Sequence, residues 1–164
     1  MINLDYASHT PVDKTVLEAF CKTEEMFLAN AMSAHKMGAD AWLEMKRVTS
    51  GIAQLVGALE DEIIFTSGAT EANNLAIKGI TKAYEHVGKH ILTTPFEHPS
   101  VSGTLQTLVG KGYEIEILKV LPDGTVDLDY LENSGVVRKD TVLVCISAVD
   151  SELGTIQPIE NLAQ

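Results

Sequence analysis

The sequence is poor in residues that several classes of protein require. It has only two cysteines in 164 residues, and Cys21 and Cys145 lie far apart with no CxxC spacing. This argues against a disulfide-rich scaffold and against a cysteine-ligated zinc site. Basic residues number 12 against 23 acidic ones, which gives a formal charge of −11. Nucleic acids and anionic membrane surfaces are bound through basic patches, so neither is an expected partner.

Long apolar runs and aromatic residues are also scarce. No run approaches the length that spans a bilayer, and the first residues carry neither the basic region nor the apolar region of a secretory signal. Together with the few, widely spaced cysteines, these absences predict a cytoplasmic protein. Aromatic residues make up 5% of the chain and apolar residues 45%, so the core is expected to be mainly aliphatic.

The histidines give no ligand pattern for a metal ion. His86 and His90 stand four apart, but Gly88 lies between them near a predicted helix end. The sequence therefore predicts no metal site, and we expect solvated histidines at His9, His35, His86, His90 and His98.

Helical and extended segments alternate along the chain. Apolar residues at three- and four-residue spacing predict helices over residues 12–27, 39–57, 71–86, 100–111 and 128–136. Strands are predicted over 62–66, up to about Thr93, over 113–120 and over 141–149. The last of these is almost wholly apolar, which favours a central strand covered on both faces. The alternation indicates an α/β fold with a mostly parallel sheet flanked by helices, and ligands of such sheets bind at the carboxyl ends of the strands.

Turn residues predict several boundaries of these elements. Pro11 is placed for the first turn of a helix, and Gly112 for the end of another. The run Pro122–Gly124 predicts a turn, and a loop leading into a further helix is expected after residue 150.

The stretch FTSGATEANNLAI, residues 65–77, joins a predicted strand to a predicted helix through small residues. The first amide N–H groups of a helix are unpaired, and small side chains let an anion approach them. Ala69 and Thr70 are thus candidates for a phosphate cradle, with Glu71 as a possible cap. An ordinary turn that uses Thr70 as a cap remains the alternative.

Two further loops follow predicted strands and should reach the same sheet edge. In TTPFEHPS, His98 could stack on a flat ring or move protons near neutral pH, or be a plain surface histidine. In AVDSELGT, polar groups are supplied by Asp150, Ser151 and Glu152. Their convergence indicates a ligand site more strongly than any one loop does alone.

The order and spacing of these segments resemble a known family. The segments LDYASHTPVDKTVLEAF, EIIFTSGATEANNLAIKG, KHILTTPFEHPSV, DGTVDLDYL and ELGTIQPI are similar to the N-terminal part of cysteine desulfurases, which are pyridoxal 5'-phosphate (PLP) enzymes of the class V aminotransferase group. The resemblance covers essentially the whole chain. It implies an incomplete type I PLP-transferase large domain over residues 16–164, preceded by an N-terminal arm over residues 1–15.

The resemblance also implies roles for particular residues. Ala69 and Thr70 match the positions that hold the cofactor phosphate, and His98 matches the residue that stacks on the pyridine ring and assists proton transfer. Ser151 and Asp150 stand where the family has an Asn pair, one member of which lies near the ring hydroxyl. Further departures are DYASHTP and NAMSAH, where the family has DNAATTP and NPSSxH.

Family members are more than twice as long as this chain. The resemblance implies that the missing part holds the lysine that forms the Schiff base with PLP, the Asp at the pyridinium nitrogen, the substrate Arg and the sulfur-accepting Cys. We therefore expect this chain alone to be inactive and not to bind PLP covalently. Neither Cys21 nor Cys145 is expected to carry sulfur.

Three interpretations of the chain remain. It is part of a cysteine-desulfurase-like enzyme (cysteine C–S cleavage and sulfur transfer, with sulfur-acceptor proteins as partners) completed by a C-terminal half. It is a non-catalytic module that forms a homodimer or interacts with another protein. Or it is part of another class V aminotransferase-type enzyme. An incomplete sheet would leave apolar surface uncovered, which predicts self-association.

Overall fold

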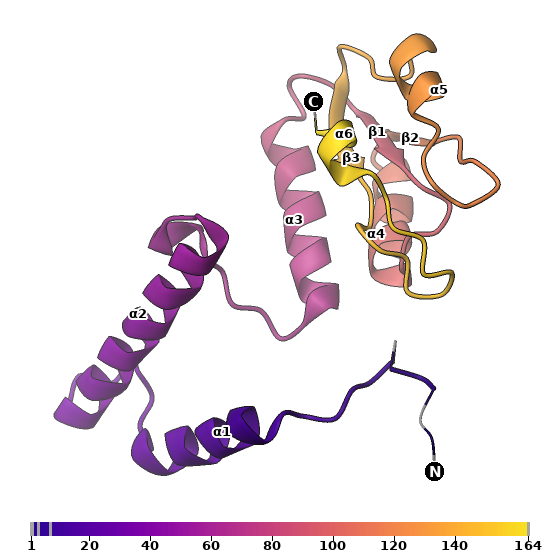
Figure 1. Ribbon diagram of the computed structural model, residues 1–164. Coiled ribbons are helices and arrows are strands. Elements are labelled where there is room, and N and C mark those ends of the chain that lie inside the picture. Colours follow the sequence, from indigo (N-terminus) through magenta and orange to yellow (C-terminus); the bar gives the residue numbers. More distant parts are fainter. Residues whose placement is uncertain (1, 3, 7, 164) are drawn as a thin grey trace. The chain divides into compact units, whose positions relative to one another are not determined.

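The computed structural model describes residues 2, 4–6 and 8–163 (Figure 1). Contacts divide the chain into two compact units, Met1–Phe65 and Thr66–Gln164. None of the described helices is long and apolar enough to cross a membrane.

The first unit contains two helices. Helix α1 spans Lys14–Met26, and its cap is Asp13, whose carboxylate accepts the Thr15 N–H at 2.8 Å. The prediction that Pro11 lies in the first turn is therefore wrong, because the aspartate sets the start. Helix α2 spans Lys36–Val56. It begins earlier than its apolar pattern predicts because His35 Nδ1 accepts the Gly38 N–H at 3.3 Å.

The strand predicted over residues 62–66 is wrong. A 3-10 turn, η1, occupies Glu60–Glu62, and Ile63 continues in an extended conformation. No strand pairs with this segment among the described residues, and Ile64 and Phe65 are 68% and 59% exposed. The prediction of extended backbone holds at Ile63, but a strand also needs a hydrogen-bonded neighbour.

The first unit buries little of its apolar surface. Helix α1 has no buried residue, and α2 buries only small ones, Gly38, Ala41 and Ala53. Large apolar side chains are exposed on both helices, among them Val16, Leu17, Phe20, Trp42, Leu43 and Met45. Such faces are amphipathic helix surfaces without a covering layer.

The second unit has the predicted alternation of helix and strand. In chain order it contains α3 (Ala69–Ala83), β1 (His90–Thr93), α4 (Pro99–Val109), β2 (Glu114–Ile117), α5 (Leu128–Asn133), β3 (Thr141–Cys145) and α6 (Ile159–Leu162). The strands form a parallel sheet in the order β2-β1-β3. The α/β class with a parallel sheet flanked by helices is confirmed.

The central strand of this sheet is β1, and all four of its residues are buried. Strand β3 pairs with β1 alone among the described strands, and Val144 is 46% exposed. The prediction that residues 141–149 form a central strand covered on both faces is therefore wrong. Apolar composition shows that a strand can be buried, but its place in the sheet depends on pairing with distant segments.

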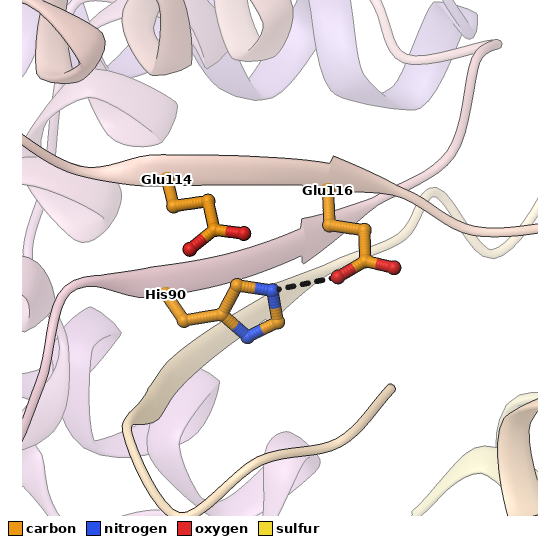
Figure 2. A group of neighbouring side chains, drawn as sticks. All are labelled: His90, Glu114 and Glu116. Carbon is orange, nitrogen blue, oxygen red and sulfur yellow. Dashed lines mark hydrogen bonds and ion pairs between the residues drawn. The ribbon is translucent and has the colours of Figure 1, made fainter. Parts of the chain in front are cut away.

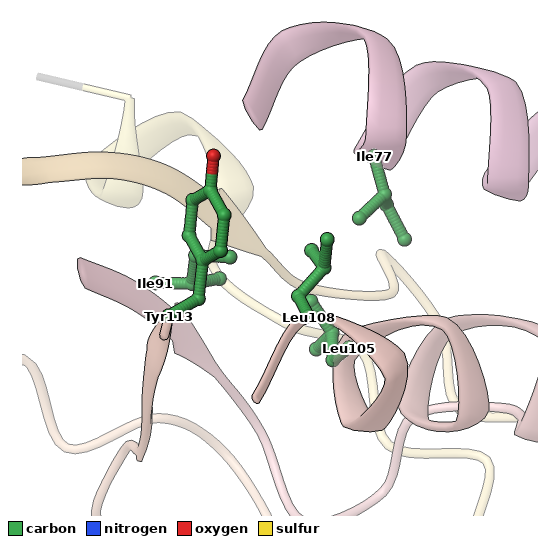
Figure 3. Close-up of a cluster of buried hydrophobic side chains, with 5 residues drawn as sticks. All are labelled: Ile77, Ile91, Leu105, Leu108 and Tyr113. Carbon is green, nitrogen blue, oxygen red and sulfur yellow. The ribbon is translucent and has the colours of Figure 1, made fainter. Parts of the chain in front are cut away.

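Separate apolar clusters form on the two faces of the sheet. On one face, side chains from α3, α4 and β1 pack with Tyr113, and the members are Ile77, Ile91, Leu105, Leu108 and Tyr113 (Figure 3). The Tyr113 hydroxyl donates to the Thr81 carbonyl at 2.6 Å, so the buried ring is also satisfied. The other cluster holds Leu92, Leu118, Val126 and Val136, against which α5 and α6 place Tyr130, Leu131 and Leu162.

Tight turns connect these elements. Helix α4 ends at Val109, and Gly112 at φ 83° allows the Tyr113 N–H to reach the Leu108 carbonyl at 3.2 Å. The predicted turn at 122–124 is confirmed, with Gly124 at φ 84°. Gln157 fixes this turn, because its side chain accepts the Val126 N–H at 2.9 Å and donates to the Gly124 carbonyl at 2.8 Å.

Candidate functional site

The start of α3 presents a group of unpaired amides. Backbone N–H groups of residues 68–71 have no hydrogen-bond partner among the described residues, and the first helical bond is Ala72 N–H to the Gly68 carbonyl at 3.1 Å. The Glu71 carboxylate turns back to accept the Ser67 N–H at 2.7 Å. This hydrogen bond lowers the pKa of Glu71. The prediction that Glu71 caps the helix is wrong, because the N-cap Gly68 has no side-chain cap and Glu71 instead binds the N–H of Ser67, one residue before that cap.

His98 caps α4. Its Nδ1 accepts the Ser100 N–H at 3.1 Å and lies 2.8 Å from the Ser100 hydroxyl. Pro99 occupies the first turn of the helix, as predicted. The ring is exposed, and Nε2 has no hydrogen-bond partner among the described residues.

The loop that carries His98 is anchored to the end of β3 by Glu97. One carboxylate oxygen accepts the Thr94 hydroxyl at 2.7 Å and the Ser147 N–H at 3.0 Å. The other accepts the Ser147 hydroxyl at 2.6 Å. Three hydrogen bonds to one carboxylate tie the carboxyl ends of β1 and β3 together, so the backbone at His98 has a defined place above the sheet.

Two hollows border the His98 ring. One of about 360 Å³ is lined by Thr70, Asn74 and His98, with residues of the first three turns of α4. A second, of about 350 Å³, lies along α3 and β3 and includes Glu97, Cys145 and Ser147. The structure thus brings Thr70 and His98 to one concave surface. Neither hollow has a lysine in its lining. Ala69, the first residue of α3, is exposed beside Thr70.

In the third predicted loop, Asp150 has a local structural role. The Asp150 carboxylate accepts the N–H groups of Glu152 and Leu153. Only 8% of Asp150 is exposed, so it caps its own turn. Ser151 is exposed, and it borders neither of the hollows beside His98. Its role at a ring hydroxyl stays a prediction.

One histidine was misjudged from the sequence. His90 is fully buried rather than solvated, and its neighbours on β2 are Glu114 and Glu116 (Figure 2). Its Nε2 lies 3.1 Å from a Glu116 oxygen and its Nδ1 2.7 Å from the Thr141 hydroxyl. The alternation in YEIEI was the available signal, because it places both glutamates on one face of β2 beside β1.

Hydrogen bonds of the His90 side chain connect β1 to Glu116 on β2 and to Thr141 on β3. The Thr141 hydroxyl accepts the Arg138 N–H at 2.8 Å and also lies 2.7 Å from His90 Nδ1. Glu114 is held by the Arg138 guanidinium through two bonds of 2.9 and 2.8 Å. Both ring nitrogens and the second carboxylate are therefore already engaged by protein groups. The expectation that the chain has no metal site stays a prediction.

The two cysteines lie in different environments. Cys21 is exposed on α1, and Cys145 is half-buried at the end of β3. Burial, with a smaller contribution from Glu97, raises the pKa of the Cys145 thiol to about 11. A thiol held in its protonated form is a weak nucleophile, which agrees with the structural role inferred from the sequence.

Comparison with known proteins identifies the class to which this sheet and its loops belong. The family described as Aminotransferase class-V matches residues 2–164. The chain belongs to the class-V aminotransferase family. Cysteine desulfurases and class-V aminotransferases use PLP as their cofactor.

The most similar relatives include cysteine desulfurases. The cysteine desulfurase IscS of Dictyoglomus turgidum is 41% identical over 99% of this chain, and the mitochondrial cysteine desulfurase of Candida albicans is 40% identical. A solved NifS-like protein superposes on 97% of the chain with a TM-score of 0.90 and 38% identity. The structure of SspA in complex with cysteine matches with a TM-score of 0.86 and 37% identity.

The chain spans less than half the length of these relatives. The shares covered are 41% of the Dictyoglomus turgidum protein, 33% of the Candida albicans protein, 43% of the NifS-like protein and 46% of SspA. The resemblance drawn from the sequence is thus confirmed at the level of family and matched region.

Proposed function

We propose that this chain supplies the phosphate-binding and ring-stacking part of the PLP site of a cysteine-desulfurase-like enzyme. The observation that carries the proposal is the pairing of free amides at Ala69 and Thr70 with the His98 ring, which shares a hollow with Thr70. A dianionic phosphate is favoured at a helix N-terminus by both the N–H groups and the helix dipole.

The residues present suit the two ends of such a cofactor. The exposed Thr70 hydroxyl can add a donor to the amide group, and Glu71 does not compete because Ser67 holds its carboxylate. The His98 ring offers a flat face and a free Nε2. When bound, PLP supplies an electron sink that labilises bonds of an amino acid substrate. Ser151 is proposed to lie near the ring hydroxyl.

The rest of the reaction needs groups that these hollows do not contain. Neither hollow beside His98 is lined by a lysine or an arginine, so covalent attachment and substrate carboxylate binding are assigned to residues beyond these 164. We propose that a second polypeptide portion, corresponding to the C-terminal part of the relatives, completes the site. Cleavage of cysteine and transfer of sulfur to an acceptor protein are proposed for the completed enzyme only.

The phosphate seat can be tested by removing a single amide hydrogen. Ala69 is the first residue of α3, a position where proline fits the helix but has no N–H. Losing one hydrogen bond to a charged phosphate costs about 1.5–3 kcal/mol, which is roughly 10- to 100-fold in affinity. We expect A69P to weaken reversible PLP binding by this factor, measured by fluorescence titration. H98A should weaken PLP binding more than A69P does.

A matched control is the same change at the first position of α1. K14P also places proline at the start of a helix, but in the other unit. It should leave PLP affinity unchanged. Two results would contradict a phosphate site at residue 69. One is that A69P binds PLP as tightly as the unmodified chain. The other is that the unmodified chain binds phosphate-free pyridoxal as tightly as PLP.

The exposed apolar face of the first unit favours a second candidate function. Helix α1 has no buried residue and exposes Val16, Leu17 and Phe20. A non-catalytic module that binds a second copy of this chain would cover these residues. Light scattering should then show a dimer that F20E dissociates, whereas a monomer at high concentration contradicts this candidate.

Since both cysteines are free, we propose a reducing compartment such as the cytoplasm.

A further inference from the structure

A chain of hydrogen bonds links α3 to His98. The Asn73 side chain donates its Nδ2–H to the Ser100 hydroxyl oxygen at 2.8 Å. That hydroxyl lies 2.8 Å from His98 Nδ1. Ser100 is only 7% exposed, and Asn73 is half-buried on the fifth residue of α3. The Ser100 hydroxyl in the middle of this linkage is therefore largely sheltered from water, and the linkage joins α3 to α4.

The direction of each hydrogen bond follows from the donors. Asn73 Nδ2 can only donate, so it occupies a lone pair of the Ser100 oxygen. The Ser100 proton is then free to point at His98 Nδ1. The Ser100 backbone N–H also points at Nδ1, at 3.1 Å. With two donors aimed at it, Nδ1 carries no proton, and in a neutral ring the proton resides on Nε2.

We propose that Asn73, acting through the Ser100 hydroxyl, is a positioning residue that holds His98 with its proton on Nε2. This inference deepens the proposed function and rests on it for its catalytic meaning. A neutral ring in this form offers a hydrogen-bond donor to the group in the hollow. It does not offer a base there, because its lone pair on Nδ1 is turned to Ser100.

The tautomer can be measured on the unmodified chain without cofactor. Long-range ¹H–¹⁵N correlation spectra of histidine-labelled protein at pH 8 distinguish protonated from unprotonated ring nitrogens. The His98 signals are assigned by their loss in H98Q. We expect Nε2 to be protonated and Nδ1 unprotonated. The reverse pattern would overturn the inference without any variant of Asn73 or Ser100.

Reversing the hydrogen bond between Asn73 and Ser100 tests whether Asn73 acts on His98 through Ser100. In N73D the new carboxylate accepts the Ser100 proton, so the serine oxygen turns a lone pair toward His98 Nδ1. The share of rings protonated on Nδ1 should rise at least threefold. N74D carries the same change one residue on, but Asn74 contacts Thr70 and Lys78 rather than Ser100, so it should leave the share unchanged.

The double variant decides whether Ser100 carries the effect. In an S100A background the N73D change should shift the tautomer by less than a third as much as in the unmodified chain. An equal shift in both backgrounds, or no shift in folded N73D, rules out an action of Asn73 through Ser100. If N73D does not fold, S100A alone should still raise the Nδ1-protonated share about twofold, and no rise overturns the proposal.

The proposed function fails in a distinguishable way. Addition of PLP to the labelled chain should move the His98 signals if the ring stacks on the cofactor. If the tautomer is as expected but PLP leaves these signals unchanged, the positioning role of Asn73 is retained and the cofactor role of His98 is rejected.

Discussion

Removal of the Glu97 carboxylate should loosen the loop that carries His98. E97A leaves the Thr94 hydroxyl and the Ser147 N–H without their acceptor. Thr94 is 4% exposed and cannot easily turn to water, whereas Ser147 is half-buried. An orphaned buried donor costs about 1–3 kcal/mol. We expect a loss of about 2–4 kcal/mol in the free energy of unfolding of the second unit.

The conservative variant should cost less. In E97Q the amide oxygen can still accept from Thr94 and the Ser147 N–H, and the amide nitrogen can donate to the Ser147 hydroxyl after it rotates. The charge assistance is lost, so a cost of about 1 kcal/mol is expected. Glu132, exposed on α5, provides a control, because E132A should change the free energy by less than about 0.5 kcal/mol.

Urea unfolding followed by circular dichroism measures these differences, and hydrogen exchange adds a local readout. The Ser147 amide should exchange much faster in E97A than in E132A, because its acceptor is gone. If E97A and E132A unfold at the same urea concentration and the Ser147 amide is equally protected in both, Glu97 does not anchor the loop. Equal losses in E97Q and E97A would show that geometry contributes less than charge.

Three further predictions follow from burial and charge. At pH 8, Cys145 should react with iodoacetamide about tenfold more slowly than Cys21, because its raised pKa cuts the thiolate fraction about 100-fold while higher nucleophilicity returns part of that. L105A should lower the free energy of unfolding by about 2–5 kcal/mol, since Leu105 is 2% exposed in the cluster of Figure 3. The hydrogen bond from the Ser67 N–H to the Glu71 carboxylate should stabilise the start of α3 at pH 7 and be lost in acid.

The acid effect has a defined sign. The folded-state pKa of Glu71 lies below its ordinary value of 4.5, so the stabilisation is complete above that value and disappears as the pH falls through the lower folded-state pKa. Thermal unfolding at pH 7 and pH 3 of the unmodified chain and E71Q should show a difference that shrinks in acid. A difference equal at both pH values contradicts the assignment.

The two cysteines and the core leucine have simple controls. V109A changes a residue of α4 that is 45% exposed, and it should cost far less than L105A. For the thiols, denaturation in urea should bring Cys145 to the rate of Cys21. A rate gap that persists in the unfolded chain would assign the difference to sequence rather than burial.

The helices of the second unit were predictable because their apolar periodicity is local. The positions of β1 and β2 were also predicted, since short β-branched runs lie between clear helix signals. The order β2-β1-β3 was not, because pairing joins residues such as His90 and Thr141 that are distant in sequence. The segment at Ile64 failed for the same reason, since extended backbone alone does not make a strand.

The candidate site was predicted in outline. Small residues before a helix and a histidine after a strand pointed to Thr70 and His98, which line one hollow, although the segment before Ala69 is not a strand of the sheet. The roles of Asn73 and Ser100 were missed, because their contact depends on how α3 packs on α4. No local pattern encodes that distance. The burial of His90 was missed because its partners lie on the neighbouring strand.

The strand order also bears on how the second unit folds. His90 pairs with Glu114 and with Thr141, and the second pairing closes roughly twice the loop of the first. Closing a longer loop costs more chain entropy, and non-local pairing is slow. We therefore expect β1, α4 and β2 to assemble as an early intermediate, with β3 docking last. On that pathway the Glu97 anchor would form only at the final step, together with the hollow that lies along α3 and β3.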